Sequence, residues 1–145
     1  MKETESGFTL IGLMVLAIIL AIGTIPFMLR TSCGCGGPAG NEASAFASLR
    51  TLSTVSEQYL NRFDTYPVTT PLATLEATGY VDSNLGGGSK SGYDFVFVGT
   101  ATAWSCTAAP TTPGSTGKRY FFVDESGVIR WDGAAAATVA SPAID

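Results

Sequence analysis

The 145-residue chain has no histidine, and only 14% of its residues are charged, whereas about 25% is typical of soluble domains. The lack of histidine excludes catalytic triads built on imidazole, haem attachment through C-x-x-C-H and mixed Cys/His zinc sites. The eight Lys and Arg form no basic run and are outnumbered by twelve Asp and Glu, which gives a net charge of −4. This distribution offers no basic patch to a phosphate backbone, so we do not expect nucleic-acid binding. Because the chain lacks histidine, we also expect no enzymatic activity.

Charge is absent from one long stretch near the amino terminus. Residues 8–29 form an uncharged run of 22 residues, which as a helix would be roughly 33 Å long against a hydrocarbon core of about 30 Å. The sequence therefore predicts a transmembrane helix over residues 8–30. A cleaved signal peptide is one alternative, but its apolar stretch is about 7–15 residues and follows a basic segment. A lipoprotein cut before Cys33 is another, but Arg30 is misplaced in the small-residue box that such a cut requires. The segment MKETES that precedes this run holds one Lys and two Glu.

The start of the uncharged run carries a family resemblance. The motif GFTLI at residues 7–11, followed by LMV at 13–15, resembles the amino terminus of type IV pilins and of the related type II secretion pseudopilins. The resemblance implies cleavage between Gly7 and Phe8 by a prepilin peptidase, and methylation of the new Phe8 amine. The residues that it assigns to an assembly helix are Phe8, Thr9, Leu10, Ile11, Gly12, Leu13, Met14, Val15 and Pro26.

The chain departs from the family pattern at two of these positions. Gly12 stands where the family usually has Glu, and Pro26 lies somewhat earlier than the usual proline. No acidic residue between Phe8 and Leu29 replaces the missing Glu. We therefore expect the Phe8 amine to lack its usual acidic partner. Either the subunit occupies a tip or minor position, where no neighbour faces this amine, or apolar packing alone suffices for ordinary incorporation, which we favour.

Composition divides the rest of the chain. Residues 1–7 are the expected leader peptide, and residues 31–40, with the sequence TSCGCGGPAG, are expected to form a hinge because Gly and Pro disfavour helix. A pilin-like globular head is expected over residues 41–145. Its first element is an amphipathic helix that starts with Asn41 as N-cap and Glu42 in the first turn, and ends before Tyr66.

The remainder of the head has the pattern of a short helix and a sheet. A helix is expected after Pro71, a loop over GGGSKSG at 86–92, and a strand from Tyr93, where apolar residues alternate with others. Further strands are expected at about 103–109, 118–123 and 128–131, the last two joined by a turn. The Ala-rich tail is expected to be loosely ordered. The predicted fold is thus α+β: an N-terminal transmembrane helix, then an amphipathic helix packed on a four-stranded antiparallel sheet.

The three cysteines leave two arrangements open. Cys33 and Cys35 are too close in sequence to form an unstrained bridge with each other. Cys106 pairs with one of them, or all three are thiols and Cys106 is a buried strand residue. We expect no metal site and no cofactor, because a thiolate site needs a fourth ligand. The acidic residues Asp124, Glu125 and Asp132 are better explained as a solvated turn than as a calcium site, which takes six to eight oxygens.

The resemblance implies a structural protein. We expect a type IV pilus-like subunit that is held in the inner membrane and then packs with other copies of itself into a filament at the cell surface. Its other partners would be the prepilin peptidase and the assembly machinery of a pilus or secretion system. The alternatives are a secretion pseudopilin, a minor or tip pilin, and, from a different class, a single-pass periplasmic binding protein that does not assemble.

Overall fold

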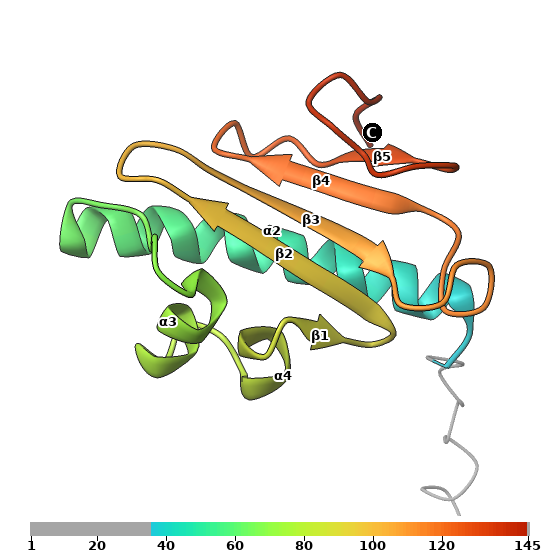
Figure 1. Ribbon diagram of the computed structural model, residues 1–145, viewed down its shortest axis with the longest axis horizontal. Coiled ribbons are helices and arrows are strands. Elements are labelled where there is room, and N and C mark those ends of the chain that lie inside the picture. Colours follow the sequence, from blue (N-terminus) through green and yellow to red (C-terminus); the bar gives the residue numbers. More distant parts are fainter. Residues whose placement is uncertain (1–35, 145) are drawn as a thin grey trace, which may run out of the picture. The chain divides into compact units, whose positions relative to one another are not determined.

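One long helix packed against an antiparallel sheet forms the head of the protein (Figure 1). In a computed structural model of the chain, the described part comprises residues 36–144. The five strands are hydrogen-bonded in chain order, so the sheet is a meander. The helices are α2 (Pro38–Phe63), α3 (Pro71–Ala77) and α4 (Ser83–Gly86), and the strands are β1 (Ser89–Lys90), β2 (Tyr93–Gly99), β3 (Trp104–Pro110), β4 (Tyr120–Asp124) and β5 (Arg130–Asp132).

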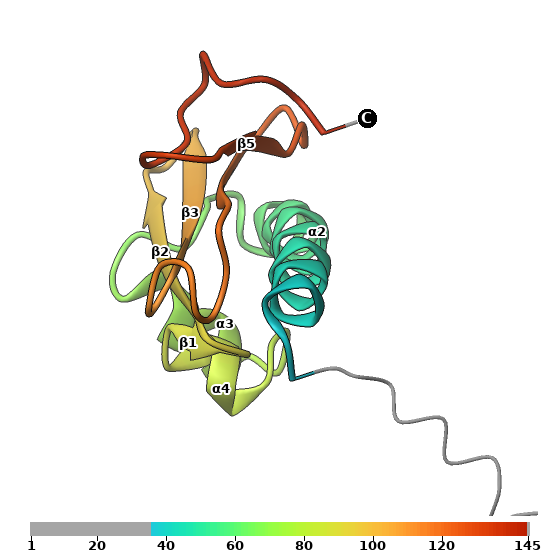
Figure 2. The ribbon, with the colours of Figure 1, turned by 90° about the vertical axis from the view of Figure 1, so that its right-hand side faces the viewer.

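Helix α2 covers one face of the sheet (Figure 2). Its apolar positions recur with helical spacing, and Ala45, Leu49 and Leu52 have no exposed surface. Burial of such side chains against the sheet stabilises the head by about 1.5–3 kcal/mol for each large aliphatic residue. The expected amphipathic helix packed on the core of its own domain is confirmed.

The sheet follows the alternation that the sequence shows from Tyr93 onward. In β2, Tyr93, Phe95 and Phe97 are buried and the residues between them are exposed, as expected for a strand with one face on the core. The ring of Phe97 stacks on that of Trp104 from β3, with centroids 5.2 Å apart. The expected strands from Tyr93 and near 103–109, 118–123 and 128–131 correspond to β2, β3, β4 and β5.

The expectation of a four-stranded sheet is wrong, because the sheet has five strands. The segment GGGSKSG was expected to be a loop, but Ser89 and Lys90 pair with Asp94 and Tyr93 as β1. Positive φ angles at Ser91 and Gly92, 51° and 72°, turn the chain between the two strands. The added strand is only two residues long, so its sequence contains too little alternation to reveal it.

The transmembrane helix of the predicted fold is also corrected. Within residues 36–144, no helix combines the length and the apolar character that crossing a bilayer requires. Helix α2 has 26 residues but includes four charged side chains and many Ser and Thr. The expected span, residues 8–30, lies outside the described residues. The described fold is therefore an α+β domain, a long helix on a five-stranded sheet.

Helix α2 begins three residues before its expected start. Pro38 opens the first turn, where the absence of a backbone N–H costs nothing, and Gly37 is the N-cap. The last three residues of the expected hinge, 38–40, are therefore helical. Asn41 does not cap the helix, and its side-chain amide instead donates a hydrogen bond to the carbonyl oxygen of Thr116, 2.9 Å away.

The Ala-rich tail is fixed to the sheet rather than loosely ordered. The backbone N–H of Trp131 donates to the carbonyl oxygen of Pro142 (3.0 Å), and that of Ile144 donates to Ile129 (2.9 Å). Ala137 is 2% exposed. These bonds join the end of the described chain to β5, a long-range pairing that the composition of the tail does not indicate.

Candidate functional site

Most of the predicted site residues lie outside the described part of the chain. They are the expected cleavage and methylation positions Gly7 and Phe8, the assembly residues Thr9, Leu10, Ile11, Gly12, Leu13, Met14, Val15 and Pro26, and the cysteines Cys33 and Cys35. Their roles stay predictions. Cys106 is the predicted site residue that the structure describes.

Within residues 36–144, Cys106 has no disulfide partner, and its thiol lies on the core-facing side of β3. Its side chain has no exposed surface, and burial raises the pKa of the thiol to about 12. Because the thiolate is the reactive form, this cysteine is an inert core residue at neutral pH. Its pairing with Cys33 or Cys35 stays a prediction, since those two residues lie outside the described part.

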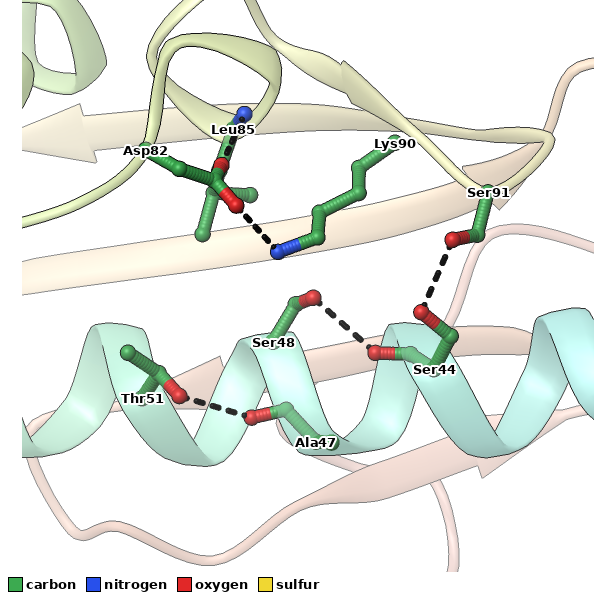
Figure 3. A network of polar contacts seen from close by, with 8 residues as sticks. All are labelled: Ser44, Ala47, Ser48, Thr51, Asp82, Leu85, Lys90 and Ser91. Atoms are coloured by element: carbon green, nitrogen blue, oxygen red, sulfur yellow. Dashed lines mark hydrogen bonds and ion pairs between the residues drawn. The ribbon is translucent and has the colours of Figure 1, made fainter. Parts of the chain in front are cut away.

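A polar groove runs between α2 and the segment that links α3 to β1 (Figure 3). It has a volume of about 430 Å³. Ser44, Ser48 and Thr51 line the α2 side, and Asp82 and Lys90 face them. The Lys90 ammonium nitrogen lies 2.7 Å from Oδ2 of Asp82, in an ion pair whose side chains are 30% and 51% exposed.

The polar groups of this groove are largely bonded to one another. Asp82 also accepts the backbone N–H of Leu85 at 2.9 Å, which caps α4. The bond from Lys90 and this cap together lower the pKa of Asp82. Ser48 donates to the carbonyl oxygen of Ser44, and the Ser44 hydroxyl donates to Ser91. The lining therefore pairs no nucleophile with a general base. Its bonds join the start of α4 to β1 through Asp82 and Lys90, and join α2 to the turn after β1 through Ser44 and Ser91.

Glu42 ties the beginning of α2 to the connection between β3 and β4. Its carboxylate accepts the backbone N–H of Lys118 and the Nε–H of Arg119, both at 2.8 Å. Glu42 is 8% exposed. Burial raises the pKa of the carboxyl group, but the bonds from Lys118 and Arg119 and the charge of Arg119 outweigh it and leave the pKa below its ordinary value. The side chain thus acts as an ionised anchor between elements 76 residues apart in sequence.

Glu57 forms a second inward contact near the other end of α2. Its Oε1 accepts the hydroxyl of Tyr66 at 2.9 Å and the indole N–H of Trp104 at 3.3 Å. Burial, followed by the bond to Glu57 and its charge, raises the pKa of Tyr66 to about 12. Tyr66 therefore stays protonated and donates to Glu57 throughout the physiological range.

Neither glutamate was expected in these roles. Glu42 was expected only in the first turn of the helix, and no role was expected for Glu57. A signal for Glu42 was nevertheless present, because it precedes Ala45 by three residues and Leu49 by seven, on the apolar stripe itself. A carboxylate at a stripe position requires a buried partner, but the sequence does not identify Lys118 and Arg119 as that partner.

The acidic residues of the late turn have local structural roles. Asp124 accepts from the backbone N–H of Ser126, and Asp132 accepts from those of Ala134 and Ala135. These bonds lower the pKa of Asp132. Among residues 36–144, no three His, Cys, Asp or Glu side chains are grouped so that they could hold a metal ion.

Searches with this chain against protein-family models, curated proteins and solved structures find no match. The residues of this chain are therefore the basis of the proposed function.

Proposed function

We propose that this protein is a structural subunit of a type IV pilus-like filament, and that it has no enzymatic activity. The precursor is held at the inner membrane, processed between Gly7 and Phe8 and methylated on Phe8. It then packs with other copies through its uncharged N-terminal segment into a filament at the cell surface.

One observation carries this proposal: the Gly7-Phe8 pair immediately precedes 22 residues without a charge. Such a segment is stable in lipid or against other apolar segments, but not in water. In a filament core, the apolar segments of other copies can surround this segment in place of lipid. The prepilin peptidase and the assembly machinery are the proposed partners, and the closest variants of the proposal are a secretion pseudopilin and a minor or tip subunit.

The polar groove between α2 and β1 favours a second function. In that case the chain is a membrane-anchored periplasmic protein whose head binds a ligand and which does not assemble. Recovery of the protein separates the two functions. A filament subunit is released by mechanical shear as high-molecular-weight fibres, whereas an anchored binding protein stays with the membrane fraction.

Intact mass of the protein from its native host tests the processing step. We expect loss of residues 1–7 and one added methyl group, which peptide mapping places on Phe8. A Gly7→Leu variant should keep its leader, and Gly12→Ala, five residues further along, should be processed like wild type. A mature protein that begins at Met1, or near Cys33, contradicts the proposal.

A further inference from the structure

The polar groove between α2 and the segment that links α3 to β1 has the size of a small-ligand site. Its volume is about 430 Å³, within the range of about 300–1,000 Å³ that is usual for small-molecule pockets. Most such pockets are lined mainly by apolar side chains, whereas hydroxyl, carboxylate and ammonium groups face this one (Figure 3). The lining therefore favours a ligand that is itself polar.

The α2 wall of the groove offers hydrogen-bond acceptors. Ser48 and Thr51 each donate to the backbone carbonyl oxygen four residues earlier, at 2.9 and 3.1 Å, and the Ser44 hydroxyl donates to that of Ser91 at 2.9 Å. A hydroxyl has one hydrogen and two acceptor lone pairs. Because these three hydrogens are already bonded inside the protein, the three oxygens are left to accept hydrogens from a ligand.

The opposite wall offers hydrogen-bond donors. The Lys90 ammonium has three N–H groups, of which one donates to Oδ2 of Asp82 at 2.7 Å. The Lys90 side chain is 30% exposed, and its ammonium end points from β1 toward α2 (Figure 3), so its other N–H groups face the groove. A ligand in the groove thus meets acceptors on one side and donors on the other.

The charges of the lining disfavour an ionic ligand. Asp82 and Lys90 neutralise each other in their ion pair, and the other described residues of the lining are uncharged. An anion would meet the Asp82 carboxylate and the lone pairs of the α2 hydroxyls, and a cation would meet the Lys90 ammonium. Because an ion that leaves water needs a compensating charge, the groove favours a neutral ligand.

Apolar surface lies beside these polar groups. Tyr80 and Val81 belong to the lining of the groove, and both also pack against the core. The ring of Tyr80 is in edge contact with that of Tyr59, with centroids 6.3 Å apart. A ligand that combines C–H surface with several hydroxyls can therefore pack on one part of the lining and form hydrogen bonds with the rest.

From these features we propose that the groove binds a neutral saccharide of one or two sugar rings. Its hydroxyls, which both donate and accept, donate to Ser48 and Thr51 and accept from Lys90, while its C–H groups pack on Tyr80. The inference rests on the second proposed function, a head that binds a ligand, and names the class of that ligand. It does not require assembly into a filament.

Titration of the full chain in phosphocholine micelles tests the proposal, because detergents with sugar headgroups would compete for the groove. The probes are maltose, cellobiose, lactose and diacetylchitobiose, and backbone amide shifts in NMR spectra report binding. We expect at least one disaccharide to give saturable shifts within residues 44–51 and 79–90, with a Kd below about 10 mM. Sodium sulfate and methylammonium chloride supply an anion and a cation and should not bind there.

A matched pair of variants locates the site. Thr51 and Thr54 are both exposed on α2, and both donate to the carbonyl oxygen four residues earlier at 3.1 Å, but Thr51 lines the groove and Thr54 does not. We expect Ser48→Ala and Thr51→Ala each to weaken disaccharide binding by about threefold or more. Thr54→Ala should bind like wild type.

Three results would overturn the inference. They are the absence of saturable shifts with all four disaccharides, equal binding by Thr51→Ala and Thr54→Ala, and groove shifts with sulfate or methylammonium alone. The last result would still leave a head that binds a ligand, so it contradicts the saccharide and not the second proposed function. Shear of the native host reports separately on the filament, since an absence of fibres contradicts assembly and not the saccharide site.

Discussion

Ser56 lies on the core-facing side of α2 with no exposed surface, and its hydroxyl has no hydrogen-bond partner among the described residues. A buried polar group without a partner costs about 1–3 kcal/mol, and Ala is also the better helix former. We therefore predict that Ser56→Ala raises the free energy of unfolding by about 1 kcal/mol, and Tm by about 4 °C, as measured by thermal unfolding.

The control for this prediction is Ser48, which is 5% exposed on the same helix. Its hydroxyl donates to the carbonyl oxygen of Ser44, so Ser48→Ala removes a satisfied bond and should leave Tm nearly unchanged. An equal rise in both variants would show that helix propensity, not the missing partner at Ser56, determines the effect.

Glu42 gives a prediction with a pH dependence. Glu42→Gln keeps the shape of the side chain but removes its charge, and should lower the free energy of unfolding by about 1.5–3 kcal/mol at pH 7, the range for hydrogen bonds to charged groups. Because the folded pKa lies below the ordinary value of 4.5, the stabilisation by Glu42 is present above that value and is lost as pH falls through the folded pKa.

Denaturant titrations of wild type and Glu42→Gln from pH 7 to pH 3 measure this difference. The difference in the free energy of unfolding between the two proteins should become smaller toward pH 3. Glu125→Gln, an exposed carboxylate of the late turn, should change stability by less than about 0.5 kcal/mol. If this difference in the free energy of unfolding stayed constant with pH, the ionised state of Glu42 would contribute nothing to stability.

At the scale of secondary-structure elements, the carboxy-terminal tail provides a test. We predict slow amide hydrogen exchange at Trp131 and Ile144, whose N–H groups donate to Pro142 and Ile129, and fast exchange at the exposed Ala136. Deleting residues 141–145 removes the acceptor of Trp131 and should accelerate its exchange while leaving Phe97 in β2 protected. Equal exchange at Trp131 in both proteins would show that the tail does not hold β5.

The elements that the sequence predicts are those whose pattern is local and repeated. The alternation from Tyr93 to Phe97 identifies β2, and the stripe through Leu49 and Leu52 identifies α2, because both faces are defined within a single segment. Strand β1 is too short to show an alternation, and the tail depends on partners elsewhere in the chain. Lys90 pairs with Tyr93 only because two residues with positive φ intervene, and the tail is held by acceptors and donors around Ile129.

At the scale of the whole molecule, the proposed function depends on a sequence motif that lies outside the described head. The motif at Gly7 and Phe8 can be identified from the sequence without a structure, because a resemblance depends on residue identity alone. The inward contact of Glu57 is not predicted in this way, since Glu57 lies seven residues from the exposed Arg50, on the same side of the helix. Only the positions of Tyr66 and Trp104 show that the glutamate turns inward.

The central claim, assembly into a filament, is tested most directly by cryo-electron microscopy of fibres sheared from the native host. The account predicts a helical map in which the head of residues 36–144 repeats at every subunit, with the mature chain starting at Phe8. Fibres whose density does not fit this head, or a protein recovered only in the membrane fraction as single chains, would contradict it.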